Sequence, residues 1–317
     1  MSFKEELDRK AAGCEAVLKQ YLPQEEGYQK TVLEAMNYSV LAGGKRLRPM
    51  LMKESFKLFG GQGTIVEPFM AALEMIHNYS LVHDDLPCMD NDEYRRGRKT
   101  TWTVYGDGMA VLAGDALLNY AFETASGAFA MIDSAYENTD EMNQQQAVSF
   151  AARYAAVGKA MAVLAKKAGV YGMIGGQCAD IEAEEKSAEE VDTDLLLYIH
   201  KNKTAALIES ALMIGAILAG ASAQEVAAME KVGENIGIAF QIQDDILDVT
   251  STLEELGKPI HSDEKNQKTT YVTLFGIEKS REIAAKLSDE AIAIWEKQGE
   301  SCAFLLELTK YLLTRTF

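Results

Sequence analysis

The sequence predicts an all-α fold, a single large helical bundle of roughly ten core helices around a central cavity. Apolar residues recur at helical spacing through nearly every segment of the 317-residue chain. Alternating strand patterns are nearly absent, and helices do not alternate with strands, which argues against an α/β fold. No Pro/Gly/Ser-rich linker divides the chain, so we expect one domain over residues 1–317.

Helical spacing defines the expected elements in order. In the first half of the chain, amphipathic patterns favour helices over 4–20, 28–41 and 48–59. Gly43 and Gly44 separate two of them. An apolar-faced run covers 67–83, and an Ala-, Leu- and Phe-rich run covers 107–129.

The polar stretch 133–144 predicts an exposed loop. In the second half, the same spacing favours helices over 145–168, 193–221, 223–249, 277–298 and 302–314.

Composition excludes some classes of partner. The net charge of −17 at pH 7 argues against a nucleic-acid or anionic-membrane surface. The four cysteines are widely spaced and form no CxxC pair, which favours a reducing cytoplasm. The N-terminus lacks an apolar signal core, and the most apolar stretch, 204–221, carries Glu209 and falls short of the ~20 residues that span a bilayer. We therefore expect a cytoplasmic protein without membrane insertion.

Two aspartate clusters each follow an apolar, helix-like run. They are Asp84, Asp85 and Asp90 in HDDLPCMDNDEYRRG, and Asp244, Asp245 and Asp248 in FQIQDDILDV. Neighbouring carboxylates cannot all ionise without cost. Mg²⁺ relieves that repulsion because it takes one or two carboxylates together with substrate phosphates. The clusters therefore predict a metal-bridged diphosphate site between two helices.

The spacing within each cluster differs. Asp244 and Asp248 are four apart and share a helix face, with Gln241 three residues earlier; a solvated acidic face is the alternative. Asp84 and Asp90 are six apart, but Pro87 ends the helix and the turn there could return Asp90 to Asp84. A helix end followed by an acidic loop is the alternative.

Basic residues occur in tight groups that favour phosphate binding. Helix N-termini and guanidinium groups both bind phosphate. Alternatives remain for each group: a basic surface turn, a snorkelling lysine or a charged loop. The groups are Lys45 and Arg48 after two glycines, Arg95 and Arg96 after the first acidic cluster, Lys203 and Thr204 in a helix, and Lys258, Asp263 and Lys268 after the second cluster.

The ordered set of motifs resembles the trans-isoprenyl diphosphate synthases, most closely the bacterial farnesyl diphosphate synthases. The resemblance covers about residues 27 to 275 and rests on GGKRLRP, DDLPCMD, RRG, GMIGGQCAD, KNKTAALI, FQIQDDILD and GKPIHSDEKNQKTTY. It implies condensation of isopentenyl diphosphate with dimethylallyl or geranyl diphosphate to give farnesyl diphosphate. The implied course is ionisation, condensation and elimination, in a dry pocket and with three Mg²⁺ ions stabilising the departing diphosphate.

The resemblance also implies roles for individual residues. The metal ligands are Asp84, Asp90, Asp244 and Asp248, with Asp85 supporting. The allylic diphosphate is held by Arg95, Lys203, Thr204, Gln241 and Lys258, of which Arg95, Lys203, Thr204 and Gln241 are also catalytic. Isopentenyl diphosphate is held by Lys45, Arg48, His77, Arg96 and Phe240.

Product length is expected to depend on the helix that carries Asp84. Tyr79 lies five residues earlier, about 7.5 Å along the axis. In the bacterial farnesyl synthases an aromatic residue here is associated with a C15 stop. Ideal helix geometry places Ser80 nearer than Tyr79 to the face of Asp84, so Tyr79 could instead be only a core aromatic.

Other functions stay open at this point. The alternatives are a geranylgeranyl diphosphate synthase, a terpene cyclase and a non-catalytic partner subunit of a prenyl synthase. Both acidic motifs and the GGKRLRP segment argue against the last two. The family implies a homodimer. The chain ends in TRTF, without the basic tail that closes the site in many relatives.

Overall fold

The structure is a computed structural model that describes residues 2–136, 142–184, 186, 190–250 and 269–314. These residues are almost entirely helical, and their strands form one two-stranded sheet. The all-α prediction is confirmed. The chain divides into two compact units, Met1–Ala162 with Ile217–Gly220, and Val163–Ala216 with Ala221–Phe317. Each is described by itself, and the single domain over 1–317 stays a prediction.

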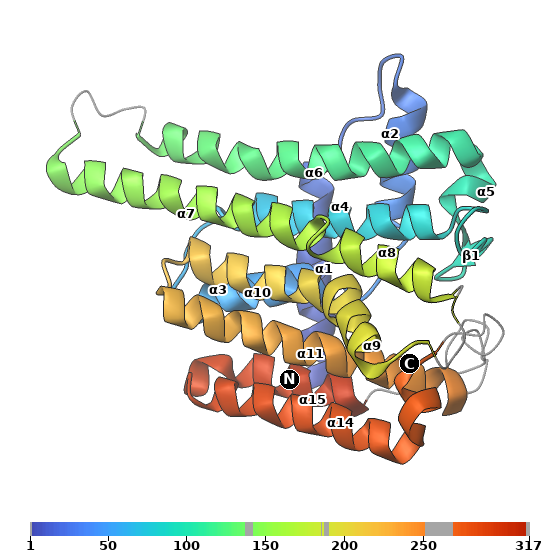
Figure 1. Ribbon diagram of the computed structural model, residues 1–317. Coiled ribbons are helices and arrows are strands. Elements are labelled where there is room, and N and C mark those ends of the chain that lie inside the picture. Colours follow the sequence, from blue (N-terminus) through green and yellow to red (C-terminus); the bar gives the residue numbers. More distant parts are fainter. Residues whose placement is uncertain (1, 137–141, 185, 187–189, 251–268, 315–317) are drawn as a thin grey trace. The chain divides into compact units, whose positions relative to one another are not determined.

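The first unit is built around α4 (Glu67–Asp84), whose apolar residues are buried on all sides except for the half-buried Leu81. It packs along α6 (Asp107–Tyr136), beside which it lies in Figure 1. The face of α6 that is buried carries mainly small residues at three- and four-residue spacing, which lets two helices approach closely. The buried residues are Ala110, Ala113, Gly114, Leu117, Ala121, Ala125, Ala128 and Ile132, of which only Leu117 and Ile132 are large.

Three helices at the start of the chain pack on α4: α1 (Phe3–Tyr21), α2 (Lys30–Val40) and α3 (Leu47–Leu58). A capping box between Ser2 and Glu5 starts α1. The hairpin of β1 (Tyr94–Arg95) and β2 (Arg98–Lys99) and the short α5 (Thr101–Tyr105) connect α4 to α6. The helix α7 (Gln144–Ala168) follows α6 and leads into the second unit.

The second unit packs α11 (Ala223–Thr250) against α14 (Tyr271–Glu296), and the two run side by side in Figure 1. Buried Ile238, Ile242 and Ile246 of α11 belong to its core. The unit also holds α8 (Met173–Glu184), α9 (Thr193–Ile199), the π-helix η1 (His200–Ala205), α10 (Ala206–Leu218) up to Ala216, the 3-10 turn η2 (Glu300–Cys302) and α15 (Ala303–Thr314).

Some boundaries differ from the sequence prediction. The expected helix over 193–221 is broken by the π-helix, and α6 continues through Tyr136 into the stretch expected to be a loop. Spacing did not predict α8, because its two glycines interrupt the apolar period. The stretch Gln144–Glu184, which contains α7 and α8, is long and apolar enough to cross a membrane by length and composition, which is weak evidence for a span.

Candidate active site

The first acidic cluster forms a turn that returns on itself. Helix α4 ends at Asp84, and Pro87 lies in the turn that follows. The amide of Asp90 then donates a hydrogen bond of 2.8 Å to the carbonyl of Asp84, and the amide of Leu86 donates one to His83. The expected return of Asp90 to the end of α4 is therefore present in the backbone. Asp84 is half-buried and Asp90 is exposed.

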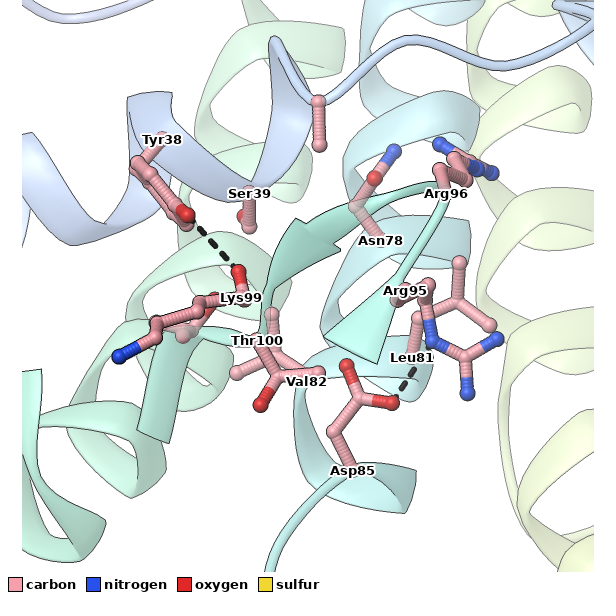
Figure 2. A pocket seen from close by; sticks show the side chains of 12 residues that line it. Tyr38, Ser39, Asn78, Leu81, Val82, Asp85, Arg95, Arg96, Lys99 and Thr100 are labelled. Carbon is pink, nitrogen blue, oxygen red and sulfur yellow. Dashed lines mark hydrogen bonds and ion pairs between the residues drawn. The ribbon is translucent and has the colours of Figure 1, made fainter. Parts of the chain in front are cut away.

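The side chain of Asp85 lines a cavity, shown in Figure 2. It is 4% exposed, and the Nε of Arg95 donates a hydrogen bond of 2.7 Å to its Oδ1. Burial raises the pKa of Asp85 to about 6, even though Arg95 opposes the shift. Arg95 also lies 3.6 Å from a carboxylate oxygen of Asp92. Asp85 therefore orients Arg95, and its supporting role at the metal site stays a prediction.

Positive charge gathers around His77 in the first unit. Burial lowers the pKa of His77 well below its usual value, and the charges of Arg48, Arg96, Arg95 and Arg46 lower it further. Burial also lowers the pKa of Arg48 to about 10; the charge of Glu74 opposes this shift, and that of Arg96 adds to it. The imidazole is therefore neutral at pH 7, among guanidinium groups that repel each other.

The arginines of this group differ in their partners. Arg46 adopts a left-handed backbone conformation, and its guanidinium is buried against Glu15 and Glu74, each at 2.7 Å. Within the part of the chain that the structure describes, Arg48 and Arg96 form no ion pair with a carboxylate, and the Nε of Arg48 has no hydrogen-bond partner. Two guanidinium groups that form no ion pair can bind an anion such as a diphosphate.

A cavity of about 30 Å³ adjoins these residues, enough space for a few water molecules. Figure 2 shows Arg95 and Arg96 on the hairpin at one side of it and Tyr38 on α2 at the other. Lys45, also expected to bind phosphate, is exposed just before Arg46.

The residues expected to limit product length lie on α4. Tyr79 is 6% exposed, and its hydroxyl has no hydrogen-bond partner among the described residues. Its ring meets that of His83 edge-on at 5.8 Å. Burial raises the pKa of Tyr79 to about 12, and the charge of Asp84 contributes to the shift. Ser80 is half-buried, and its hydroxyl donates to the carbonyl of His77.

The second acidic cluster lies at the C-terminal end of α11. Asp245 is 3% and Asp248 5% exposed, whereas Asp244 is half-buried. A solvated acidic face is therefore not what the structure shows. One oxygen of Asp245 accepts from Gln241 at 3.3 Å and the other from the amide of Tyr271 at 3.3 Å. Asp245 thus connects α11 to the start of α14.

A polar chain joins the π-helix to α11. The hydroxyl of Thr204 donates to the side-chain oxygen of Gln241 at 2.9 Å, and Gln241 donates onward to Asp245. The structure therefore brings together two of the expected catalytic residues, Thr204 and Gln241. Phe240, the expected wall of the isopentenyl pocket, directly precedes Gln241 in the sequence and is half-buried.

Lys203 is held by a partner that the sequence did not suggest. Its ammonium lies 2.5 Å from a carboxylate oxygen of Asp180 on α8. Gly176 lets α8 approach this turn, because a β-carbon there would lie 2.1 Å from the backbone nitrogen of Lys203. The segment GMIGGQCAD could have indicated this contact, because it combines two adjacent glycines that allow close helix packing with an aspartate a few residues later.

His200 was also missed. It is 5% exposed, its ring packs on Tyr271 at 5.1 Å, and burial lowers its pKa to about 4. The expected ligand Lys258, with Asp263 and Lys268, lies outside the described residues.

Comparison with known proteins assigns the chain to a family. The profile of the polyprenyl synthetase family matches residues 29–308, and the chain belongs to that family. The chain has the all-α fold of the solved prenyl synthases and is a prenyltransferase of isoprenoid biosynthesis.

Three similar proteins illustrate the range of the family. The chain is 42% identical to the large subunit 1 of a heterodimeric geranylgeranyl pyrophosphate synthase from Arabidopsis thaliana, over 89% of this chain and 71% of that protein. An apo FPP/GFPP synthase from Zymomonas mobilis superposes with a TM-score of 0.82 at 31% identity, covering 98% of this chain and 99% of the other. A Helicobacter pylori geranyltransferase complexed with magnesium and isoprenyl diphosphate gives 0.78 at 30% identity, covering 99% and 97%.

The carboxylates present suit a magnesium ion that is shared with substrate. No group of three or more His, Cys, Asp or Glu side chains that could hold a metal ion by itself occurs among the described residues. The turn does bring Asp90 back to Asp84, which gives hard oxygen donors at the end of α4. Mg²⁺ commonly takes one or two carboxylates and completes its octahedral shell with water and phosphate oxygens. The donor set fits that mode of binding.

Proposed function

We propose that the protein condenses isopentenyl diphosphate with dimethylallyl or geranyl diphosphate to give farnesyl diphosphate. Arg48 and Arg96 carry the proposal, because they have no carboxylate partner among the described residues and lie close to the neutral His77. Arg48 is half-buried and Arg96 is exposed, and two neighbouring guanidinium groups that form no ion pair with a described residue favour a multiply charged anion. Together with Lys45, these groups would hold the diphosphate of isopentenyl diphosphate.

The leaving diphosphate would be stabilised by metal ions and by basic side chains. In the first unit, Asp84 and Asp90 are the proposed metal ligands and Arg95 binds the allylic diphosphate. In the second unit, Asp244 and Asp248 are the proposed ligands, with Lys203 and Lys258 on the diphosphate. Bound Mg²⁺ would supply electrostatic stabilisation of the charge that develops on the leaving group. Three ions are expected.

The condensation would begin with cleavage of the C–O bond of the allylic diphosphate, which releases diphosphate and leaves an allylic cation. The double bond of isopentenyl diphosphate attacks that cation, and an oxygen of the released diphosphate takes up the proton whose loss restores a double bond. Thr204 and Gln241 form a hydrogen-bonded pair that would present polar oxygens to the cation. Phe240 would help to exclude water from the homoallylic pocket.

A geranylgeranyl diphosphate synthase is the second candidate, because a relative at 42% identity is the large subunit of such an enzyme. Tyr79 favours the shorter product, since a buried aromatic ring on α4 can limit the space for a growing chain. A homodimer is our expectation for the assembly, and a partner subunit is the alternative.

The test is incubation with isopentenyl and geranyl diphosphates, with and without Mg²⁺, followed by product sizing. We expect a C15 product that requires Mg²⁺. A C20 product would support the second candidate, and no product under any condition would refute both. Arg96→Ala should raise KM for isopentenyl diphosphate. Lys99→Ala, which removes the same charge from the same hairpin, is the control.

A further inference from the structure

The hairpin that carries Arg95 and Arg96 has little stability of its own. Each strand has two residues, paired Tyr94 with Lys99 and Arg95 with Arg98. Both residues of its tight turn, Arg96 and Gly97, have positive φ, 54° and 73°. Glycine adopts this conformation readily, whereas arginine does so at a cost. An isolated two-stranded hairpin is marginal in water, so contacts outside it must hold Arg96 in place.

The base of the hairpin is fixed on one side. Thr100 and Trp102 both donate side-chain hydrogen bonds to the carbonyl of Asp92, at 2.8 and 2.9 Å. The side chain of Arg95 is fixed by Asp85. These contacts orient Arg95 but leave Arg96 to be positioned by the other side of the hairpin.

That other side is the C-terminal end of α2, and Tyr38 makes the principal contacts there. Its hydroxyl donates a hydrogen bond of 2.7 Å to the carbonyl of Lys99 (Figure 2). The guanidinium of Arg98 lies over the Tyr38 ring, 4.5 Å from its centroid. The ring of Tyr105 packs edge-on against Tyr38 at 5.7 Å. One side chain therefore holds both the backbone and a side chain of strand β2.

The contacts of Arg96 depend on that placement. Its guanidinium donates to the carbonyl of Gly43, and a β-carbon on Gly44 would lie 2.8 Å from its Cζ. Arg98 donates to the carbonyl of Leu41 at 3.4 Å. A movement of the hairpin away from α2 would separate Arg96 from Gly43 and Gly44. It would also separate Arg96 from Arg48, whose pKa is lowered by the charge of Arg96.

We propose that Tyr38 is a positioning residue, which holds the hairpin against α2 and so keeps the Arg96 guanidinium where it binds the diphosphate of isopentenyl diphosphate. This inference rests on the proposed function, because it assigns to Arg96 the role described there. Tyr38 would act on binding of one substrate and not on cleavage of the allylic C–O bond.

The test is Tyr38→Phe, which keeps the ring and removes the hydroxyl. A neutral hydrogen bond of ordinary strength predicts about a fivefold rise in KM for isopentenyl diphosphate. The kcat, the KM for geranyl diphosphate and the melting temperature should stay near those of the wild type. Tyr105→Phe is the matched control, because it removes a neighbouring hydroxyl that forms no hydrogen bond to the described residues of the hairpin, and it should leave both KM values unchanged.

A double-mutant cycle separates positioning from general destabilisation. In an Arg96→Ala background, Tyr38→Phe should have no further effect on KM for isopentenyl diphosphate, because the residue it positions is gone. Unchanged KM in the single variant, or an equal effect in both backgrounds, would overturn the proposal. Wild-type protein that does not turn over these substrates would instead refute the proposed function.

Discussion

The amide of Asp90 donates a hydrogen bond of 2.8 Å to the carbonyl of Asp84, so the acidic segment after α4 closes on the helix that precedes it. Six residues apart on a straight helix, these two would point in different directions. The turn containing Pro87 places them at the same helix end. The first prediction concerns their carboxylates.

Asp84→Ala should lower kcat by about 100-fold or more, because the loss of one electrostatic stabiliser of a leaving group has an effect of that order. Asp244→Ala should act similarly through the second cluster. Steady-state kinetics over a range of Mg²⁺ concentrations would measure both. Asp8→Asn on the exposed side of α1 is the control. Near-native activity in Asp84→Ala or Asp244→Ala would contradict the metal assignment.

Tyr79→Ala should shift the products from C15 toward C20 or longer. The ring is buried on α4 and its hydroxyl has no partner among the described residues, so truncation leaves space without breaking a hydrogen bond there. Chromatography of the dephosphorylated products would show the shift. An unchanged product spectrum would remove Tyr79 as the floor of the pocket, and Ser80→Phe would then test the neighbouring position.

Arg46→Ala should destabilise the protein by about 3–5 kcal/mol, because it leaves the buried carboxylate of Glu74 without its partner. Denaturant unfolding would measure the loss. Arg9→Ala provides the control, since Arg9 is exposed and lies 3.9 Å from Glu6 in a surface pair. Such pairs contribute at most about 1 kcal/mol. Equal effects of the two substitutions would refute a structural role for the Arg46 ion pairs.

Acid should destabilise the fold through His200. Its pKa is lowered to about 4 by burial, whereas an unfolded histidine has a pKa of about 6.5. The unfolded chain therefore binds a proton first as pH falls. The stability from this group is complete above pH ~6.5 and is lost toward the folded pKa, by up to about 1.4 kcal/mol per pH unit.

Unfolding free energies measured between pH 7 and pH 5 test this expectation. His200→Gln should reduce the slope with pH, because it removes the group whose pKa differs between the folded and unfolded chain. A slope that does not change in His200→Gln would show that other groups control the acid response.

Thiol reactivity should divide the cysteines into two pairs. Cys88 and Cys178 are exposed, and Cys14 and Cys302 are buried. Burial raises the pKa of Cys14 to about 12, so little thiolate forms at pH 8. Mass spectrometry after brief treatment with a thiol reagent should find label on the exposed pair and, after denaturation, on all four. Early labelling of Cys14 would contradict its burial.

The sequence predicted the parts of the structure that depend on periodic or local chemistry. Helical spacing was enough for the all-α fold, and Pro87 was enough for the turn between Asp84 and Asp90. The partners of individual charges could not be predicted, since Arg46 and Arg48 are alike in GGKRLRP and yet only Arg46 is neutralised by Glu15 and Glu74. Those partners come from α1 and α4, and only the packing of the helices decides which arginine they reach.

The same limit applies in the second unit. Lys203 and Asp180 are 23 residues apart, and nothing local to either indicates their contact. The π-helix at His200–Ala205 was missed because its residues also fit an ordinary helix. It is the contact with α8 at Gly176, together with the bond from Thr204 to Gln241, that distinguishes this turn.

Gly176 has a consequence for laboratory evolution of this enzyme. With only 2.1 Å between a β-carbon there and the backbone nitrogen of Lys203, every substitution by another amino acid would push the lysine turn away from Asp180. Random libraries selected for new product lengths should tolerate substitutions at the exposed Tyr198. Every active variant should keep glycine at position 176.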